Sequence, residues 1–233
     1  MSWIKQNEEV IVDAELEGGS NRIDTTDAYE VEITDAHVQE SKQDGSKSLS
    51  LVIGVKTEDG ETNTTYFTIQ GRTGETWYEG TVAGKTVKKQ LFGLNIVDTL
   101  FNISLEKSIF DCEPETLTYD AWDNDAKEMV ATEGLGFADL IGKKVGICLQ
   151  MKREINGTDT KEFGNIAHFF DLETGLFHTE VDSDNRKLDR WLKNKKEYIV
   201  KEIEKPTSSF GKKKTEKNDD GVEVPKSKKW GRN

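Results

Sequence analysis

The chain has 233 residues, of which 34% are hydrophobic and 33% are charged, a composition typical of a soluble globular protein with a very polar surface. No apolar run approaches the ~20 residues that a membrane-spanning helix needs. The N-terminus lacks the basic and apolar regions of a signal peptide. We therefore expect a cytoplasmic protein with no membrane partner.

The charge is distributed unevenly along the chain. The formal net charge is −12, but residues 201–233 contain ten Lys or Arg and six Asp or Glu, so this segment has a net charge of +4 and residues 1–200 have −16. An acidic body repels polyanions at long range. Beyond Pro206 there are too few apolar residues to fold alone. The sequence predicts one domain over residues 1–200 and a flexible, disordered C-terminal tail over residues 201–233.

The first half of the chain has the period-2 pattern of half-buried strands. Apolar residues alternate with polar ones over residues 29–34 and again over residues 49–55, with a polar turn between them. Asp59-Gly60 is a turn pair, and the β-branched and aromatic residues 64–69 follow it. The pattern predicts three antiparallel strands in meander order, which form the front half of a β-sandwich or barrel.

Residues 71–93 contain five glycines together with aromatic and basic residues, and they predict a long functional loop. A helix is expected over residues 94–105, because apolar residues recur there at helical spacing.

The second half of the chain predicts a hairpin and a second helix. A short strand is expected around residues 128–132 and one helical turn over residues 137–141. Residues 145–151 alternate strictly, Asn156-Gly157 is a turn pair, and residues 162–171 are expected to return as the hairpin partner. Residues 182–197 have the pattern of a surface helix.

One motif resembles a nucleotide-binding loop. Gly80–Thr86 ends in Gly-Lys-Thr, but three residues separate its glycines where a phosphate-binding loop needs four, and no buried strand precedes it. An enzyme of nucleotide metabolism that uses Lys85-Thr86 is therefore a remote alternative.

No other pattern selects an enzyme. Cys112 and Cys148 lack the spacing of a zinc site or a disulfide framework, and both are expected to be reduced thiols. The three histidines show no metal-ligand spacing. We expect a protein with no catalytic residues, no metal and no cofactor.

The strongest remaining signal is the mixture of aromatic and basic residues. Proteins that bind single strands without sequence choice stack bases on aromatic rings, at about 1–3 kcal/mol per base, and contact phosphates with Lys and Arg. In the alternative interpretation, Phe67 and Phe92 belong to the core and the lysines form a solvated rim.

A family resemblance favours nucleic-acid binding. The aromatic strand Thr65–Gln70, the pair Trp77-Tyr78 and the run Lys88–Asn95, which leads into a helix, occur in this order. Leu140–Gly146 and the hairpin Met151–Phe170 follow. Over residues 28–200 this order resembles a family of bacteriophage single-stranded DNA-binding proteins.

The resemblance implies an OB-type antiparallel β-barrel with an inserted loop and helix. It implies that the protein binds and protects single-stranded DNA, without strong sequence preference, during phage DNA replication and recombination. Phage or host replication and recombination proteins are possible further partners, and the oligomeric state stays open. Many single-stranded DNA-binding proteins end in an acidic tail, whereas Lys226–Asn233 is basic and aromatic, which puts tail-mediated recruitment in doubt.

Candidate contacts follow from these segments. The candidate stacking residues are Tyr66, Trp77 and Tyr78. The candidate phosphate contacts are Arg72, Lys85, Lys88, Lys89, Lys152 and Arg153. The alternative function is a phage structural or assembly protein whose β domain binds protein.

Overall fold

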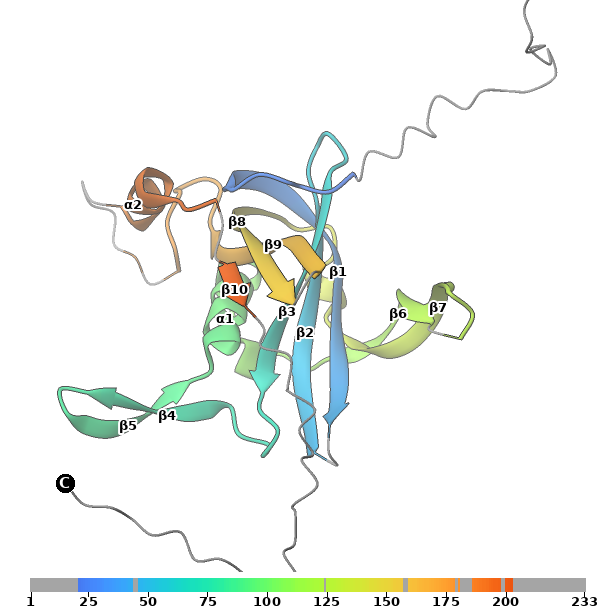
Figure 1. Ribbon diagram of the computed structural model, residues 1–233, viewed down its shortest axis with the longest axis horizontal. Helices are drawn as coiled ribbons and strands as arrows, with labels where there is room; N and C mark the ends of the chain where they lie inside the picture. Colours follow the sequence, from blue (N-terminus) through green and yellow to red (C-terminus); the bar gives the residue numbers. More distant parts are fainter. Residues whose placement is uncertain are drawn as a thin grey trace, which may run out of the picture.

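The computed structural model describes residues 21–43, 46–123, 125–156, 159–178, 180, 186–197 and 200–202. The elements in chain order are β1 (Asp27–Gln43), β2 (Ser46–Lys56), β3 (Thr62–Gln70), β4 (Trp77–Val82), β5 (Lys85–Gln90), α1 (Phe92–Leu105), η2 (Ile109–Asp111), β6 (Glu115–Asp123), β7 (Glu128–Gly136), η3 (Ala138–Leu140), β8 (Lys144–Asn156), β9 (Asp159–Phe170), α2 (Lys187–Asn194) and β10 (Val200–Glu202). Residues 203–233 of the predicted tail lie outside the described residues. Figure 1 shows the arrangement of these elements.

The three expected strands at the front of the chain form an antiparallel meander. β1 pairs with β2, and β2 pairs with β3. β1 is longer than predicted because it serves two neighbours: Asp27–Glu32 pairs with β8, and Glu32–Gln43 pairs with β2, with a register irregularity between Ile33 and Asp35. Such a register shift lets one strand bend from one partner to the next. The prediction of a mainly β chain with a few helices is confirmed.

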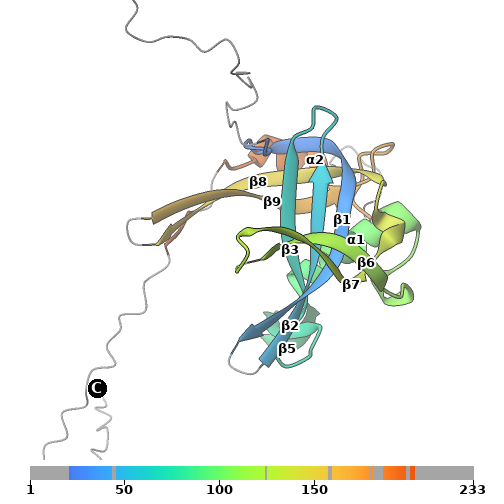
Figure 2. The same ribbon diagram turned by 90° about the vertical axis from the view of Figure 1, so that its right-hand side faces the viewer.

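The β6–β7 hairpin was predicted only in part. A short strand was expected around residues 128–132, and β7 confirms it, but β6 was not foreseen. Leu117, Tyr119 and Ala121 alternate with polar residues in β6 and are its less exposed residues. Tyr119 stacks on His37 of β1, with 3.7 Å between ring centroids. Figures 1 and 2 show this hairpin projecting from the outer side of the main sheet, to which the Tyr119–His37 stack and the His37–Gly136 pairing join it.

The predicted hairpin in the second half of the chain is β8–β9, and it joins the main sheet through β8. The strand order is β10-β8-β1-β2-β3, with β9 paired to β8. Among the described residues β3 and β9 share no backbone pairing, so the sheet does not close into a barrel. Side chains connect these two strands instead. Thr65 Oγ1 accepts a hydrogen bond from the Ile166 amide at 3.2 Å, and Asn63 Nδ2 donates one to the Gly164 carbonyl at 3.2 Å.

Helix α1 packs against β3 and β9 and completes the core. Gly93 in its first turn permits a close approach to β3, because a Cβ built there would lie 2.6 Å from the Thr68 carbonyl oxygen. The side chains that α1 buries are Leu94, Ile96, Val97, Leu100 and Phe101. The helix end is marked by Glu106, which has φ 56° and donates its backbone N–H to the Asn102 carbonyl.

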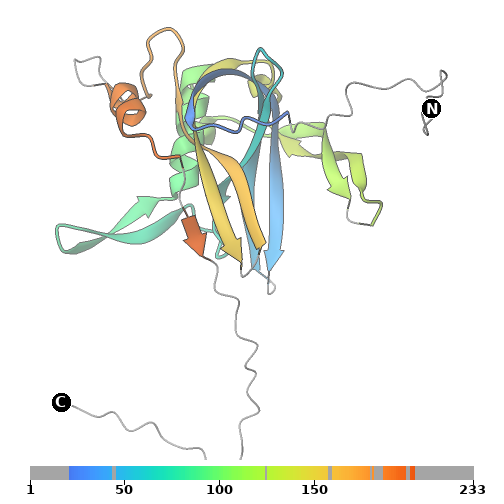
Figure 3. The same ribbon diagram turned by 45° about the horizontal axis from the view of Figure 1, so that its top comes forward.

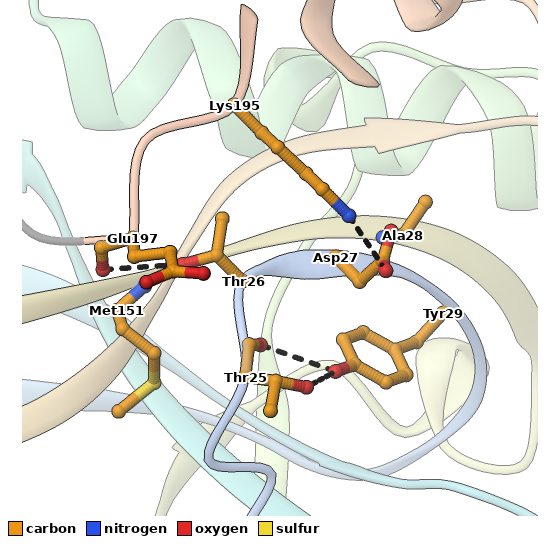
Figure 4. Close-up of polar contacts among 8 residues, drawn as sticks. All are labelled: Thr25, Thr26, Asp27, Ala28, Tyr29, Met151, Lys195 and Glu197. Carbon is orange, nitrogen blue, oxygen red and sulfur yellow. Dashed lines mark hydrogen bonds and ion pairs between the residues drawn. The ribbon is translucent and has the colours of Figure 1, made fainter. Parts of the chain in front are cut away.

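The segment after α2 is fastened to the start of β1, as Figure 4 shows. Thr26 Oγ1 donates to the Glu197 carbonyl at 3.2 Å and accepts from the Met151 amide at 2.9 Å. Lys195 Nζ contacts Asp27 Oδ2 at 2.8 Å. These contacts hold α2 near the main sheet. Among the described residues, no helix combines the length and the apolar character needed to cross a membrane.

We expect Asp27→Asn to lower the free energy of unfolding by at most about 1 kcal/mol at pH 7, because the pair with Lys195 is largely exposed. The hydrogen bond from Lys195 lowers the pKa of Asp27, the Ala28 amide adds to this, and burial opposes it. A folded-state pKa below the unfolded value stabilises the fold above the unfolded pKa, and this contribution is lost as pH falls through the folded pKa.

Urea unfolding at neutral and acid pH tests this, with Asp24→Asn, an exposed residue nearby, as the control. The difference between wild type and Asp27→Asn should narrow toward acid pH. A difference that stays constant with pH would contradict the assignment.

The two cysteines differ in accessibility, and we expect only Cys112 to react with a thiol reagent in the folded protein. Cys112 is half-buried and Cys148 is buried. Burial, with a smaller effect of Asp27, raises the pKa of Cys148 to about 12, so its reactive thiolate is scarce. Labelling followed by mass spectrometry should find Cys148 modified only after unfolding in urea. Rapid labelling of Cys148 without denaturant would show that its surroundings open readily.

Candidate nucleic-acid interface

The predicted loop over residues 71–93 is wrong in its central part, which forms the β4–β5 hairpin. The two strands make a separate two-stranded sheet that projects from the body (Figures 1 and 3). Ala83 and Gly84 connect them, with φ values of 49° and 77°. Two consecutive positive φ angles are typical of the tight hairpin turn that matches strand twist. Lys85-Thr86 therefore begins a strand, whereas a phosphate-binding loop leads into a helix.

One face of the hairpin combines an aromatic ring, apolar groups and lysines. Tyr78 pairs with Lys89 and Val82 pairs with Lys85, so their side chains share this face with Val87. Tyr78 is 46% exposed, and both valines are also exposed. A Cβ at Gly80 would lie 2.9 Å from Lys89 Cδ, so the glycine leaves room for the lysine stem.

The opposite face of the hairpin presents Trp77 and Lys88. Lys88 Nζ lies 3.8 Å from the centroid of the Trp77 ring, which is a cation–π contact worth about 0.5–1 kcal/mol at an exposed site. The ammonium group therefore covers one side of the indole. Because neighbouring residues of a strand point to opposite faces, Trp77 and Tyr78 cannot stack successive bases on one face.

The structure places Tyr66 on the outer face of β3. Tyr66 is 60% exposed, whereas its neighbour Phe67 is 3% exposed and belongs to the core. The sequence did not decide which of the two rings faces the core, because a shift of the strand register by one residue would exchange their positions. Tyr66 pairs with Val52, which in turn pairs with His37, so these residues form one row across β3, β2 and β1.

The remaining basic candidates lie outside the hairpin. Arg72 is exposed in the turn between β3 and β4. Lys152 and Arg153 are on β8 in the other hairpin, and burial lowers the pKa of Lys152. Arg153 contacts Glu162 Oε1 through Nε at 2.8 Å and Nη2 at 2.6 Å, so a phosphate would compete with this carboxylate. The structure thus gathers five candidates on one hairpin: Trp77, Tyr78, Lys85, Lys88 and Lys89.

Phe92 is an exposed aromatic residue that the sequence did not separate from the core. It is the first residue of α1 and is 67% exposed. The sequence feature that could have predicted this exposure is Gly93. Its backbone packs on β3, which leaves the preceding side chain free to face solvent. Phe92 follows β5 closely and extends the aromatic surface of the hairpin toward α1.

In the described ranges, no group of three or more His, Cys, Asp or Glu is placed to hold a metal ion. Comparison with known proteins adds no assignment: no family model matches the chain, and a search of curated proteins finds no significant match.

Proposed function

We propose that the protein binds and protects single-stranded DNA without strong sequence preference, in the host cytoplasm, during phage DNA replication and recombination. Phage or host replication and recombination proteins are the proposed further partners. The β4–β5 hairpin is the proposed centre of binding. The observation that supports this most is the projecting hairpin itself, which presents the exposed ring of Tyr78, the half-buried ring of Trp77 and three lysines on its two faces.

The chemistry of the hairpin fits a flexible polyanion with stacked bases. Each accessible aromatic ring offers about 1–3 kcal/mol of stacking energy per base, which any base can provide. Lys89 lies opposite Tyr78 on one face, with Lys85 opposite Val82 nearer the turn, and Lys88 adjoins Trp77 on the other face. A DNA strand that follows one face of the hairpin would therefore contact an aromatic ring and ammonium groups together. A DNA strand that wraps around the hairpin would contact both rings.

The connections of the main sheet support an OB-type arrangement as part of this proposal. The order is a three-strand meander, then α1, then the β8–β9 hairpin, with β8 returning to pair with β1. In an OB-type barrel the last strand would also pair with the third, and here the contacts of Asn63 and Thr65 with β9 span that position. Oligonucleotides bind the second and third strands and adjacent loops in such barrels, which would place Tyr66 on the path.

The acidic body should make the proposed interface selective for single-stranded over duplex DNA. Residues 1–200 have a net charge of −16, so attraction for phosphates is confined to places where lysines outnumber carboxylates, as on the hairpin, where Glu79 pairs with Lys88 but Lys85 and Lys89 pair with uncharged residues. We propose that this charge distribution weakens binding to duplex DNA relative to a single strand that can reach the hairpin rings.

Titration with a dT oligonucleotide of about 30 residues, followed by tryptophan fluorescence at two salt concentrations, tests the function. We expect quenching, weaker binding at higher salt, and a loss of affinity in Tyr78→Ala relative to Val130→Ala, which changes an exposed residue of the other projecting hairpin. Absence of binding at low salt would refute the proposal.

A protein-binding role in phage structure or assembly is the second candidate. The outer side of β6–β7 favours it, because Trp122, Met129 and Leu135 are all more than half exposed there. A hairpin that presents such residues is typical of a protein contact. This function would leave tryptophan emission unchanged on addition of the oligonucleotide.

A further inference from the structure

Outside the hairpin, a cavity of about 590 Å³ lies between α1 and α2 and is bounded on one side by the end of β9 and the segment after it. This volume is within the ~300–1,000 Å³ range of ligand sites. Each helix presents one face to it, at the spacing i, i+3, i+4 and i+7. From α1 these residues are Phe92, Asn95, Ile96 and Thr99, and from α2 they are Lys187, Arg190, Trp191 and Asn194.

The cavity has aromatic walls. Phe92 stands at its α1 side and Trp191 at its α2 side. His168 stacks on Phe177 with 5.0 Å between ring centroids and 25° between planes. Burial, together with the charge of Lys187, lowers the pKa of His168 and so favours the neutral imidazole. A planar aromatic ligand would find rings on more than one side.

The cavity is also basic, although the whole chain is acidic. Lys187 and Arg190 line it, and none of the described residues that line it is Asp or Glu. The nearby carboxylate of Glu180 already accepts hydrogen bonds from the amides of Phe177 and Lys187. The first turn of α1, which begins at Phe92, has no acidic residue and no side-chain cap, so its partial positive charge is not neutralised there.

The cavity lies next to the proposed DNA-binding hairpin. β5 ends at Gln90 and α1 begins at Phe92, which itself lines the cavity. In Figures 1 and 3, α2 and the β4–β5 hairpin lie on the same side of the molecule, whereas β6–β7 lies on the other. A chain of nucleotides that leaves Lys88 and Lys89 therefore has a short route to the cavity along Phe92.

We infer that this cavity binds one nucleotide of the single strand held by the hairpin, with its base between Phe92 and Trp191 and its phosphate at Lys187 and Arg190. Asn95 and Asn194 offer amide groups that can both donate to and accept from a base edge. This inference rests on the proposed function and extends it from a stacking surface on the hairpin to a cleft between two helices.

The test uses the full chain and a dT oligonucleotide of about 30 residues that contains 5-iodouracil, which cross-links to aromatic side chains under ultraviolet light. We expect mass spectrometry to find cross-links at Phe92 or Trp191. Arg190→Gln should weaken binding about fivefold at about 0.1 M salt, because one lost phosphate contact lowers the salt slope by about 0.7. Lys193→Gln is the matched control, since Lys193 is exposed on the same helix and does not line the cavity.

The inference is overturned if the oligonucleotide binds but cross-links only outside Phe92 and Trp191, and Arg190→Gln behaves as Lys193→Gln does. That result leaves the hairpin function intact. If wild type does not bind the oligonucleotide at low salt, the proposed function fails and this inference fails with it. Arg190 is exposed, so its replacement removes no core packing.

Discussion

Replacing Lys85, Lys88 and Lys89 together by glutamine is expected to weaken binding of a dT oligonucleotide about 100-fold at about 0.1 M salt. Each phosphate contact to a single strand contributes about 0.7 to the slope of log affinity against log salt, so three lost contacts lower the slope by about 2. The three lysines are on one hairpin that buries no core residue, so the fold should persist. Anisotropy titrations over a range of salt concentrations measure both effects.

The control for this variant removes the same charge elsewhere. Lys107, Lys143 and Lys193 are exposed and lie outside the hairpin and the cavity. Their joint replacement by glutamine makes the net charge equally more negative, so it measures the general repulsion of DNA by an acidic protein. Equal losses of affinity in the two triple variants would show that the hairpin lysines have no special role.

Phe101→Ala is expected to lower the free energy of unfolding by about 3–5 kcal/mol, the largest stability change we predict. Phe101 is completely buried on α1, and its ring meets Phe137 edge to face, with 4.8 Å between centroids and 88° between planes. Removing the ring loses this contact and leaves a cavity under the helix. Because α1 joins the hairpin to the cavity facing α2, loosening it should also weaken DNA binding.

Urea unfolding followed by circular dichroism measures this change. Phe110→Ala is the matched control, because Phe110 is 64% exposed and its replacement should alter the free energy of unfolding by less than about 0.5 kcal/mol. Similar losses in the two variants would mean that α1 is not anchored through Phe101.

Strands β1, β2, β3, β8 and β9 could be predicted because each has a face in the core. Val145, Ile147 and Leu149 alternate with other residues and are all buried. The β4–β5 hairpin has no core face, since Val82 and Val87 are exposed, so its apolar residues show no clear period. The sequence feature that indicates this hairpin is the turn pair Ala83-Gly84, which has β-branched residues on both sides. The absence of backbone pairing between the described residues of β3 and β9 could not be predicted, because it depends on segments far apart in the sequence and no local pattern specifies it.

The candidate site was predictable in composition and not in geometry. The sequence identified Trp77 and Tyr78 as a pair, but only a strand places them on opposite faces. It grouped Arg153 with the hairpin lysines, although Arg153 is on β8 and contacts Glu162. The cavity is lined by Phe92 and Trp191, which are about 100 residues apart in the sequence. It forms only because α2 packs near α1, where the contacts of Thr26 and Lys195 hold the segment after α2. No local sequence pattern predicts such a contact.

The most direct test of the central claim compares the affinity of the wild-type protein for a dT oligonucleotide with its affinity for a duplex of the same length, at one moderate salt concentration. Stacking needs unpaired bases, and the acidic body repels the denser charge of a duplex. The account predicts clearly tighter binding of the single strand. Equal affinity for the two, or binding of neither, would contradict it.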